Sequence, residues 1–277
     1  MSLTEQQRLL ISEHNKNWKK WGPYLSERQW STVREDYSHE GNAWGFINHD
    51  LARSYAYRWG EDGIAGFCDA DQVLCLAPVF WNGKDSILKE RLFGLTNNEG
   101  NHGEDVKEIY YHLLSSPTHS YCQYLYKYPQ SPFPYEDLLK KNQRDRLQPE
   151  FELADTGIFS ENRYFDCMIE YAKAGINDIL LKITVINRGP DTSDIHVLPH
   201  FWYRNFWRHN KRFVKPVIKA INPACIHAIS ARNGSFFLYH EGGEQLFCDN
   251  ETNTARIFHR PNETDYVKDG INNYVVN

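Results

Sequence analysis

Short apolar runs recur along most of the chain, and their spacing predicts a mainly β protein. Residues 121–128 place Tyr124, Tyr126 and Tyr128 at alternate positions, so one face of that strand should be aromatic. Turn dipeptides such as Asn82-Gly83 separate the runs at intervals of roughly 8–12 residues, which is typical of an antiparallel sandwich. No strand–helix alternation typical of a parallel sheet occurs. The predicted strands cover residues 54–59, 64–68, 73–81, 109–114, 121–128, 164–172, 179–186, 195–203, 218–221, 226–230, 236–240 and 245–248.

The first residues carry a helical pattern instead. Thr4 and Gln7 have the spacing of a capping box, in which each side chain bonds to the backbone N–H of the other residue. The pattern stops before Gly22-Pro23, a pair that breaks helices. We therefore predict a short helical arm over residues 1–20, packed on the outside of a β-sandwich domain over residues 21–277.

Two later segments also depart from the strand pattern. Residues 129–149 contain four prolines, and residues 135–143 between them look helical with Pro134 near the first turn. We expect this segment to be a small helical insertion on the surface of the domain. Residues 273–277 read as a strand that the end of the sequence interrupts, so we expect a truncated sandwich.

Composition and charge narrow the classes of partner. The chain has 277 residues, of which 41% are hydrophobic, enough for a sizeable core. Its net charge is −5, with no basic excess that would indicate nucleic acid or a membrane surface. No stretch approaches the roughly 20 apolar residues that span a bilayer. We predict neither a nucleic-acid nor a membrane partner.

The six cysteines indicate a reducing compartment. None forms a C-x-x-C pair, and several lie within apolar runs, as Cys75 and Cys167 do. Buried free thiols are typical of proteins kept under reducing conditions. The N-terminus has no apolar segment of the signal-peptide type, so we predict a cytoplasmic protein.

One polar stretch between two apolar runs is rich in donors and acceptors. It follows residues 92–95, precedes residues 109–114, and is hinged by Gly100 and Gly103, which let the backbone approach a partner closely. A polar loop held between buried elements can present binding groups, and an ordinary solvated loop has the same composition. The candidate substrate-binding side chains here are Asn97, Asn98, Glu99, Asn101, His102, Glu104 and Asp105.

Two earlier segments have a similar mixture of residues. Residues 21–37 have no regular period and combine aromatic residues with arginines and carboxylates. Such a segment is either a binding loop or a rigid strap locked by arginine–carboxylate pairs. We expect it to converge with Glu61-Asp62 and residues 97–105 at one end of the sandwich. Its candidate binding residues, with those of the second segment, are Tyr24, Glu27, Arg28, Trp30, Arg34, Glu35, Asp36, Glu61 and Asp62.

The sequence lacks the local signatures of several enzyme classes. It has no G-x-S-x-G elbow and no phosphate-binding loop. His102-Gly103-Glu104 resembles part of a zinc deaminase site, but no P-C-x-x-C follows, and the spacing after Asn97 is wrong for an EF-hand. Adjacent carboxylates such as Glu104-Asp105 point to opposite faces of a strand, so a doublet offers at most one inward group. We expect no catalytic pair, no metal and no cofactor. The later histidines should be ordinary hydrogen-bonded or surface side chains: His196, His200, His209, His227 and His240.

Five longer runs resemble one enzyme family. They are WGPYLSERQWSTVREDY (21–37), YRWGEDG (57–63), KERLFGLTN (89–97), EGNHGEDVKE (99–108) and KDGIN (268–272). The chain is similar, from about residue 18 to its end, to bacterial glucosidase-like proteins of glycoside hydrolase family 63, which are related to the processing mannosyl-oligosaccharide glucosidase. The resemblance implies an N-terminal β super-sandwich that leads into an (α/α)6 toroid. In the family the toroid carries the acid and the base of an inverting α-glycosidase.

The resemblance also implies what this chain does not carry. No run of repeated helical hairpins follows the sandwich-like region, so the family's catalytic residues have no counterpart positions here. The expectation is a non-catalytic sandwich module that shapes the cleft for an oligosaccharide or small glycoside, together with a catalytic toroid on missing sequence. The alternative is a stand-alone carbohydrate-binding or interaction protein. A third and weaker hypothesis is an independent enzyme that uses its own carboxylates.

Overall fold

Three antiparallel sheets hold most of the regular secondary structure in the described residues, so the prediction of a mainly β fold is confirmed. The computed structural model describes residues 3–15, 17–25, 47–57, 62–95, 103–143, 147–208, 210 and 212–277. The first sheet has the order β1-β2-β3-β8, the second β4-β5-β6-β7 and the third β11-β10-β9. The strands are β1 Trp21–Gly22, β2 Phe67–Asp69, β3 Leu74–Trp81, β4 Tyr110–Ser115, β5 Tyr121–Pro129, β6 Tyr164–Gly175, β7 Asp178–Asn187, β8 His196–Tyr203, β9 Val217–Asn222, β10 Cys225–Ser230 and β11 Gly234–Tyr239.

Helices are few and short by comparison. The described part of the chain has the α-helices α1 Glu5–Asn15, α2 His49–Ala52, α3 Tyr135–Asn142, α4 Thr254–Phe258 and α5 Gly270–Val276. One turn of π-helix, Asp105–Ile109, leads directly into β4. Helix α3 lies in the predicted insertion, and it begins directly after Pro134, as expected. None of the described helices is long and apolar enough to cross a bilayer.

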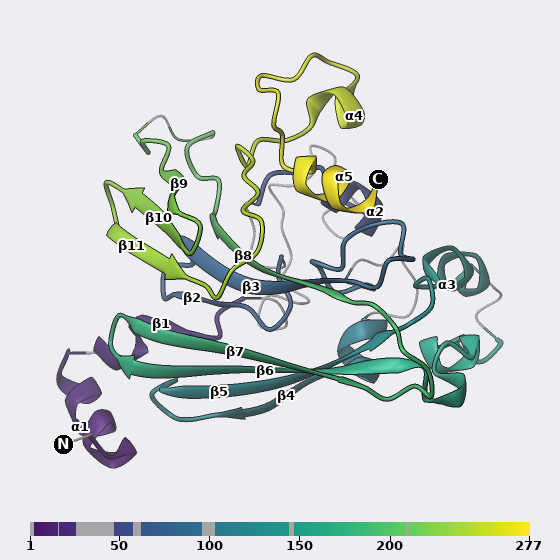
Figure 1. The fold of residues 1–277 in the computed structure, drawn as a ribbon, viewed down its shortest axis with the longest axis horizontal. Coiled ribbons are helices and arrows are strands. Elements are labelled where there is room, and N and C mark those ends of the chain that lie inside the picture. Colours follow the sequence, from purple (N-terminus) through teal and green to yellow (C-terminus); the bar gives the residue numbers. More distant parts are fainter. Residues whose placement is uncertain are drawn as a thin grey trace.

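The first and second sheets pack face to face as the two layers of a sandwich (Figure 1). Phe67 of β2 stacks on Tyr171 of β6 with ring centroids 4.7 Å apart, and Phe80 of β3 stacks on Tyr126 of β5 at 6.0 Å. The three alternate tyrosines of β5 are fully buried, so their predicted common face is confirmed. Aromatic pairs of this kind add about 0.5–1.5 kcal/mol each beyond the area that they bury. The two layers are therefore joined by stacked rings.

The third sheet lies beside β2, β3 and β8, and its inner face joins the same core (Figure 1). Phe236 of β11 makes an edge-to-face contact with Trp21 of β1 at 5.1 Å, and Ala228 of β10 is fully buried. The other face is open to solvent, where Phe237 and Tyr239 are 48% and 74% exposed. This sheet is consequently covered on one side only by the described residues.

The N-terminal arm begins with the predicted capping box. The Thr4 N–H donates to Gln7 Oε1 at 2.8 Å, and the Gln7 N–H donates to Thr4 Oγ1 at 3.3 Å. Glu5 then fastens α1 to the sandwich, because its carboxylate accepts the Thr118 hydroxyl at 2.7 Å and the Ser120 hydroxyl at 2.8 Å. These side-chain bonds dock the helix on the outside of the domain, as the sequence predicts.

A buried lysine of β6 secures the end of the arm. Lys173 is 6% exposed, and its ammonium group donates to the backbone carbonyls of Trp18, Trp21 and, at 3.3 Å, Thr118. Burial lowers the pKa of Lys173 to about 8. Three carbonyls from two segments therefore converge on one cation.

Two predicted strands are wrong because their polar groups bond to distant segments. Residues 54–57 form turns, and residues 58–59 lie outside the described part of the chain. The Tyr57 N–H donates to Asn250 Oδ1 at 2.7 Å instead of entering a ladder. Residues 245–248, which pass above β8, are likewise irregular.

The C-terminal residues are helical rather than extended. Residues 273–277, predicted as an interrupted strand, belong to α5 and its C-terminal cap, and the Asn273 N–H donates to the Asp269 carbonyl at 2.9 Å. Ile271 and Val275 are four residues apart, so they share one face of the helix, and both line a cavity over β8. The apolar residues within 273–277 that suggested a strand therefore belong to a helix packed over the sheet.

We expect Lys173→Gln to lower the free energy of unfolding by about 1–3 kcal/mol, because buried carbonyls would lose their donor. Urea denaturation followed by circular dichroism measures this change. Lys182→Gln on neighbouring β7 is the matched control, since the Lys182 side chain is 74% exposed and should matter by no more than about 0.5 kcal/mol. Equal effects of the two substitutions would contradict the anchoring role of Lys173.

Candidate functional site

The structure describes four of the residues predicted to bind substrate: Tyr24, Asp62, Glu104 and Asp105. Asp62, Glu104 and Asp105 are buried, so none of the three presents its carboxylate at an open surface. The remaining candidates lie outside the described residues, and their role stays a prediction: Glu27, Arg28, Trp30, Arg34, Glu35, Asp36, Glu61, Asn97, Asn98, Glu99, Asn101 and His102.

Asp105 lies in a fully buried ion pair rather than in a cleft. Its Oδ2 atom is 2.8 Å from Lys89 Nζ and accepts the Phe93 N–H at 2.8 Å. Lys89 is 0% exposed, and its ammonium group also lies 3.6 Å from the centroid of the Phe133 ring. Burial raises the pKa of Asp105 even though the Lys89 charge acts in the opposite direction. This arrangement indicates a structural role, in which the buried ion pair holds Lys89 and Asp105 together.

A glycine permits the close approach that buries this region. Gly94 has φ +78°, and a Cβ at that position would lie 2.7 Å from the Glu104 backbone nitrogen and 2.8 Å from that of Gly103. Only glycine combines that dihedral angle with so little space. Residues 103–105 therefore close onto residues 92–95, and the Glu104 side chain becomes fully buried.

Three consecutive charged residues, Lys89-Glu90-Arg91, form the centre of a larger cluster. All three are buried, and each pairs with a different segment of the chain. Lys89 pairs with Asp105, Glu90 with Lys268, and Arg91 with Asp62 at 3.2 Å. We call these six residues the 89–91 charge cluster. Four of the five runs that resemble the glycosidase family contribute to it: residues 57–63, 89–97, 99–108 and 268–272.

The fifth run does not join this cluster through its described residues. Trp21 pairs with Asp69, next to the Leu74 end of β3, whereas Lys89 pairs with Phe80 at the other end. Six strand residues separate these ends by roughly 20 Å. Trp21 therefore lies at the end of β3 away from Lys89, whereas Leu25 packs in one buried cluster with Tyr57 and Trp202. Residues 26–36, on which the expected convergence mainly depends, lie outside the described residues, so the convergence stays a prediction.

Tyr24 has a structural environment of its own. Its hydroxyl group donates to the Lys19 carbonyl at 2.7 Å, and its ring makes an edge-to-face contact with His119 at 5.5 Å. The Tyr24 carbonyl accepts from the Gln72 side chain at 2.5 Å. These contacts hold the chain after β1 in place, and the arginines and carboxylates that would separate a strap from a binding loop lie outside the described residues.

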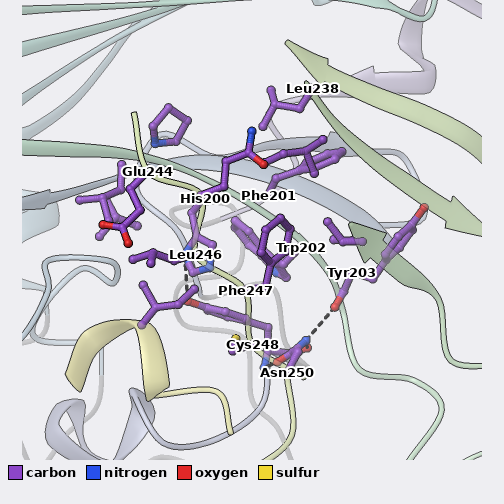
Figure 2. Close-up of a pocket in the computed structure, with 18 of the residues that line it drawn as sticks. His200, Phe201, Trp202, Tyr203, Leu238, Glu244, Leu246, Phe247, Cys248 and Asn250 are labelled. Atoms are coloured by element: carbon purple, nitrogen blue, oxygen red, sulfur yellow. Dashed lines mark hydrogen bonds between the residues drawn. The ribbon is translucent and has the colours of Figure 1, made fainter. Parts of the chain in front are cut away.

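An unpredicted cavity lies over β8. Its volume is about 970 Å³, and Figure 2 shows His200, Trp202, Leu246 and Phe247 around it. Alternate β8 residues turn away from the sandwich core, so His200 and Trp202 lie beneath the irregular segment that carries Leu246 and Phe247. The cavity is thus bounded by β8, by Ile218 and Leu238 of the third sheet, by the irregular segment and by α5.

His200 links the cavity to the 89–91 charge cluster. Its Nδ1 atom lies 3.1 Å from the Tyr57 hydroxyl, and that hydroxyl donates to Glu90. Because Tyr57 donates its hydroxyl proton to Glu90, its oxygen can only accept from His200. The hydrogen-bond network therefore assigns the proton of neutral His200 to Nδ1 and leaves Nε2 as an acceptor. Burial lowers the pKa of His200 to about 4 despite the Glu90 charge.

These groups can bind a ligand, but they do not form an acid–base pair. Glu90 is committed to Lys268 and Tyr57, and the Lys268 charge holds the pKa of Glu90 below its usual value against the effect of burial. Within the described ranges, no three His, Cys, Asp or Glu side chains are grouped so that they could hold a metal ion. The cavity offers an imidazole acceptor and aromatic walls.

Sequence reasoning missed this site for a specific reason. The β8 histidines interrupt an apolar run at positions 196 and 200, and that polar interruption was the available signal. We expected ordinary histidines there because no ligand-pair spacing was present. Tyr57 was placed in the predicted strand 54–59 and in a run that resembles a family, and Glu90 and Lys268 were noticed only as parts of such runs.

We expect Asp105→Asn to lower the free energy of unfolding by about 3–5 kcal/mol, because Lys89 would remain buried without a counter-charge. Chemical denaturation measures the change. Glu136→Gln, which breaks the exposed Glu136–Lys140 pair of α3, is the control and should change stability by less than about 0.5 kcal/mol. A small effect of Asp105→Asn would argue against a structural role for the Lys89–Asp105 ion pair.

The low pKa of His200 has a direct consequence for stability. Since unfolded histidine titrates near pH 6.5 and folded His200 near pH 4, the unfolded chain binds more protons between these values. The His200 contribution to the free energy of unfolding should therefore fall as pH falls from about 6.5 to about 4, by up to about 1.4 kcal/mol per pH unit. NMR titration of the ring should show a midpoint near pH 4, and a midpoint near 6.5 would refute the buried neutral imidazole.

Comparison with known proteins gives one informative match. No protein-family model matches the chain, and no solved structure matches it. The chain is similar to an uncharacterized protein of Saccharomyces cerevisiae, YMR196W, with 38% identity over 314 residues. The match covers 99% of this chain and 29% of the yeast protein, so the chain spans less than a third of the length of this curated relative.

Proposed function

We propose that this protein is the non-catalytic N-terminal β-sandwich module of a family 63-like α-glycosidase, and that it shapes the carbohydrate-binding cleft of a catalytic domain. One observation carries the proposal. Four runs that resemble the family meet in the 89–91 charge cluster, where their charged residues build a buried scaffold. A domain that only shapes a cleft must keep a fixed conformation. Its similarity to the family is therefore expected in the residues that stabilise its fold.

The length of the relative supports a modular role. The chain corresponds to 29% of the yeast protein, so the relative has ample further sequence for a catalytic domain. The buried candidate carboxylates also support a non-catalytic role, because Asp62 is paired with Arg91 and Asp105 with Lys89. Glycoside hydrolysis needs one carboxylic acid and one carboxylate free to face the substrate.

A stand-alone carbohydrate-binding protein is the second candidate. The cavity over β8 favours it, because the 40% exposed Phe247 contributes an aromatic ring to its wall and His200 Nε2 supplies a hydrogen-bond acceptor. Flat aromatic rings with a few polar groups suit sugar ligands. In both proposals the six free cysteines support a reducing compartment such as the cytoplasm.

We expect the purified chain to show no turnover of aryl α-glucosides, because the proposed module brings no acid–base pair. Release of the aryl group measures this directly. Turnover that Glu104→Gln or Glu35→Gln abolishes would overturn the proposal and establish an independent enzyme. The gene should continue beyond codon 277 in a segment encoding repeated helical hairpins, in frame or after a frameshift, whereas an unrelated gene there would contradict the module.

Calorimetry with glucose and mannose oligosaccharides separates the two candidates. The stand-alone protein should bind one of them by itself, and His200→Ala should weaken that binding. A module that only shapes a shared cleft should give no measurable heat in the absence of a catalytic domain. Tyr266→Phe is a suitable control and should leave binding unchanged, because the Tyr266 side chain is 69% exposed and does not line the cavity.

A further inference from the structure

The edge of β8 carries backbone groups without partners, and two prolines reveal which ones. Pro78 of β3 lies directly opposite Pro199 of β8. In an antiparallel ladder, a hydrogen-bonded pair exchanges both N–H groups, and proline has none. Pro78 and Pro199 must therefore form a non-hydrogen-bonded pair. By alternation, Leu198 and His200 bond to β3, whereas residues 197, 199, 201 and 203 direct their backbone groups away from it.

Two independent contacts agree with this assignment. Phe80 lies opposite Val197, but its backbone N–H and C=O both bond to Lys89 on the other side of β3. Phe80 therefore forms no backbone bond to Val197. The Tyr203 carbonyl accepts the Asn250 side chain at 2.7 Å, which places it on the outer edge of β8. Strand β8 ends the order β1-β2-β3-β8, so its outer edge is the edge of the sheet.

The rest of that edge is not paired by any described strand, and it borders the cavity. In the described part of the chain, the outward backbone groups of Val197, Pro199 and Phe201 have no hydrogen-bond partner. All three residues line the cavity of about 970 Å³, and Pro199 is exposed. Two N–H donors and three carbonyl acceptors are thus presented along one open channel.

We propose that the outer edge of β8 is the docking site for an extended strand of polypeptide from outside this chain. Addition of a strand to an open sheet edge is a recurrent mode of peptide recognition. The proposal rests on the proposed function, because the strand would come from the part of a longer relative that this chain does not match. That part makes up most of the length of the yeast protein.

The surroundings favour a single strand over a second copy of this chain. The edge lies within a cavity whose other walls include Ile218, Leu238 and Leu246, so a second folded sheet would meet these walls first. A self-complementary pairing centred on Pro199 would also place two donor-less residues opposite each other. A single strand with apolar side chains at alternate positions could contact the apolar walls with those side chains and bond to the unpaired backbone groups of β8 with its own backbone.

The test uses the full chain and synthetic peptides that tile the unmatched part of the yeast protein. Binding is measured by fluorescence anisotropy, and the binding site by amide hydrogen exchange. The free chain should show fast exchange at Val197 and Phe201 and slow exchange at Leu198 and His200. A bound tile should slow exchange at Val197 and Phe201, whereas scrambled peptides should not bind.

A matched pair of variants tests the backbone donor itself. Val197→Pro removes an outward N–H that the β3 ladder does not use, and proline is tolerated at such edge positions, as Pro199 already shows. Binding should weaken roughly three- to tenfold, the value of one hydrogen bond. Val197→Ala keeps the donor and should bind within about twofold of the unchanged chain.

Each remaining outcome is decisive. Failure of every tile, protection at another surface, or equal binding by Val197→Pro and Val197→Ala would overturn strand docking. Those results would leave the module proposal to the turnover and gene-continuation tests. Conversely, tile binding at β8 by a chain that hydrolyses glucosides alone would refute the non-catalytic module and keep the docking edge.

Discussion

Burial of three successive charges, Lys89-Glu90-Arg91, is the constraint on which this structure depends. An ion removed from water loses several kcal/mol of solvation unless an opposite charge and hydrogen bonds replace the water. Each of these residues finds that replacement on a different segment, at Asp105, Lys268 or Asp62. The start of the second sheet, the C-terminal helix and the chain after Tyr57 are therefore fixed relative to one short run.

The strands of the sandwich could be predicted because their signals are local. Alternating tyrosines in β5 have one buried face in any antiparallel sheet, and the structure buries all three. The helix after Pro134 and the capping box of Thr4 and Gln7 depend on contacts within a few residues. Such features are fixed by chain geometry before tertiary contacts form.

The charge cluster and the cavity could not be predicted, because their determinants are far apart in sequence. Lys89, Glu90 and Arg91 would pass for an ordinary solvated run, and their partners lie 16, 178 and 29 residues away. The same cause explains the error at residues 54–57, where Asn250 supplies the acceptor that a neighbouring strand would otherwise provide. A short apolar run such as Val275-Val276 is compatible with either a strand or a helix, and only its tertiary contacts decide between the two.

The charge cluster also accounts for the open edge of β8. Glu90 holds Lys268, and the Asn272 side chain accepts the Leu88 N–H at 2.9 Å, so α5 is fixed from both its start and its first turn. A helix held in this way cannot settle onto β8 to fill the cavity. A cavity therefore lies between α5 and β8, over His200 and Trp202, and among the described residues the outward backbone groups of Val197, Pro199 and Phe201 border it without partners. A scaffold made rigid by buried charge thus keeps one sheet edge available to another polypeptide.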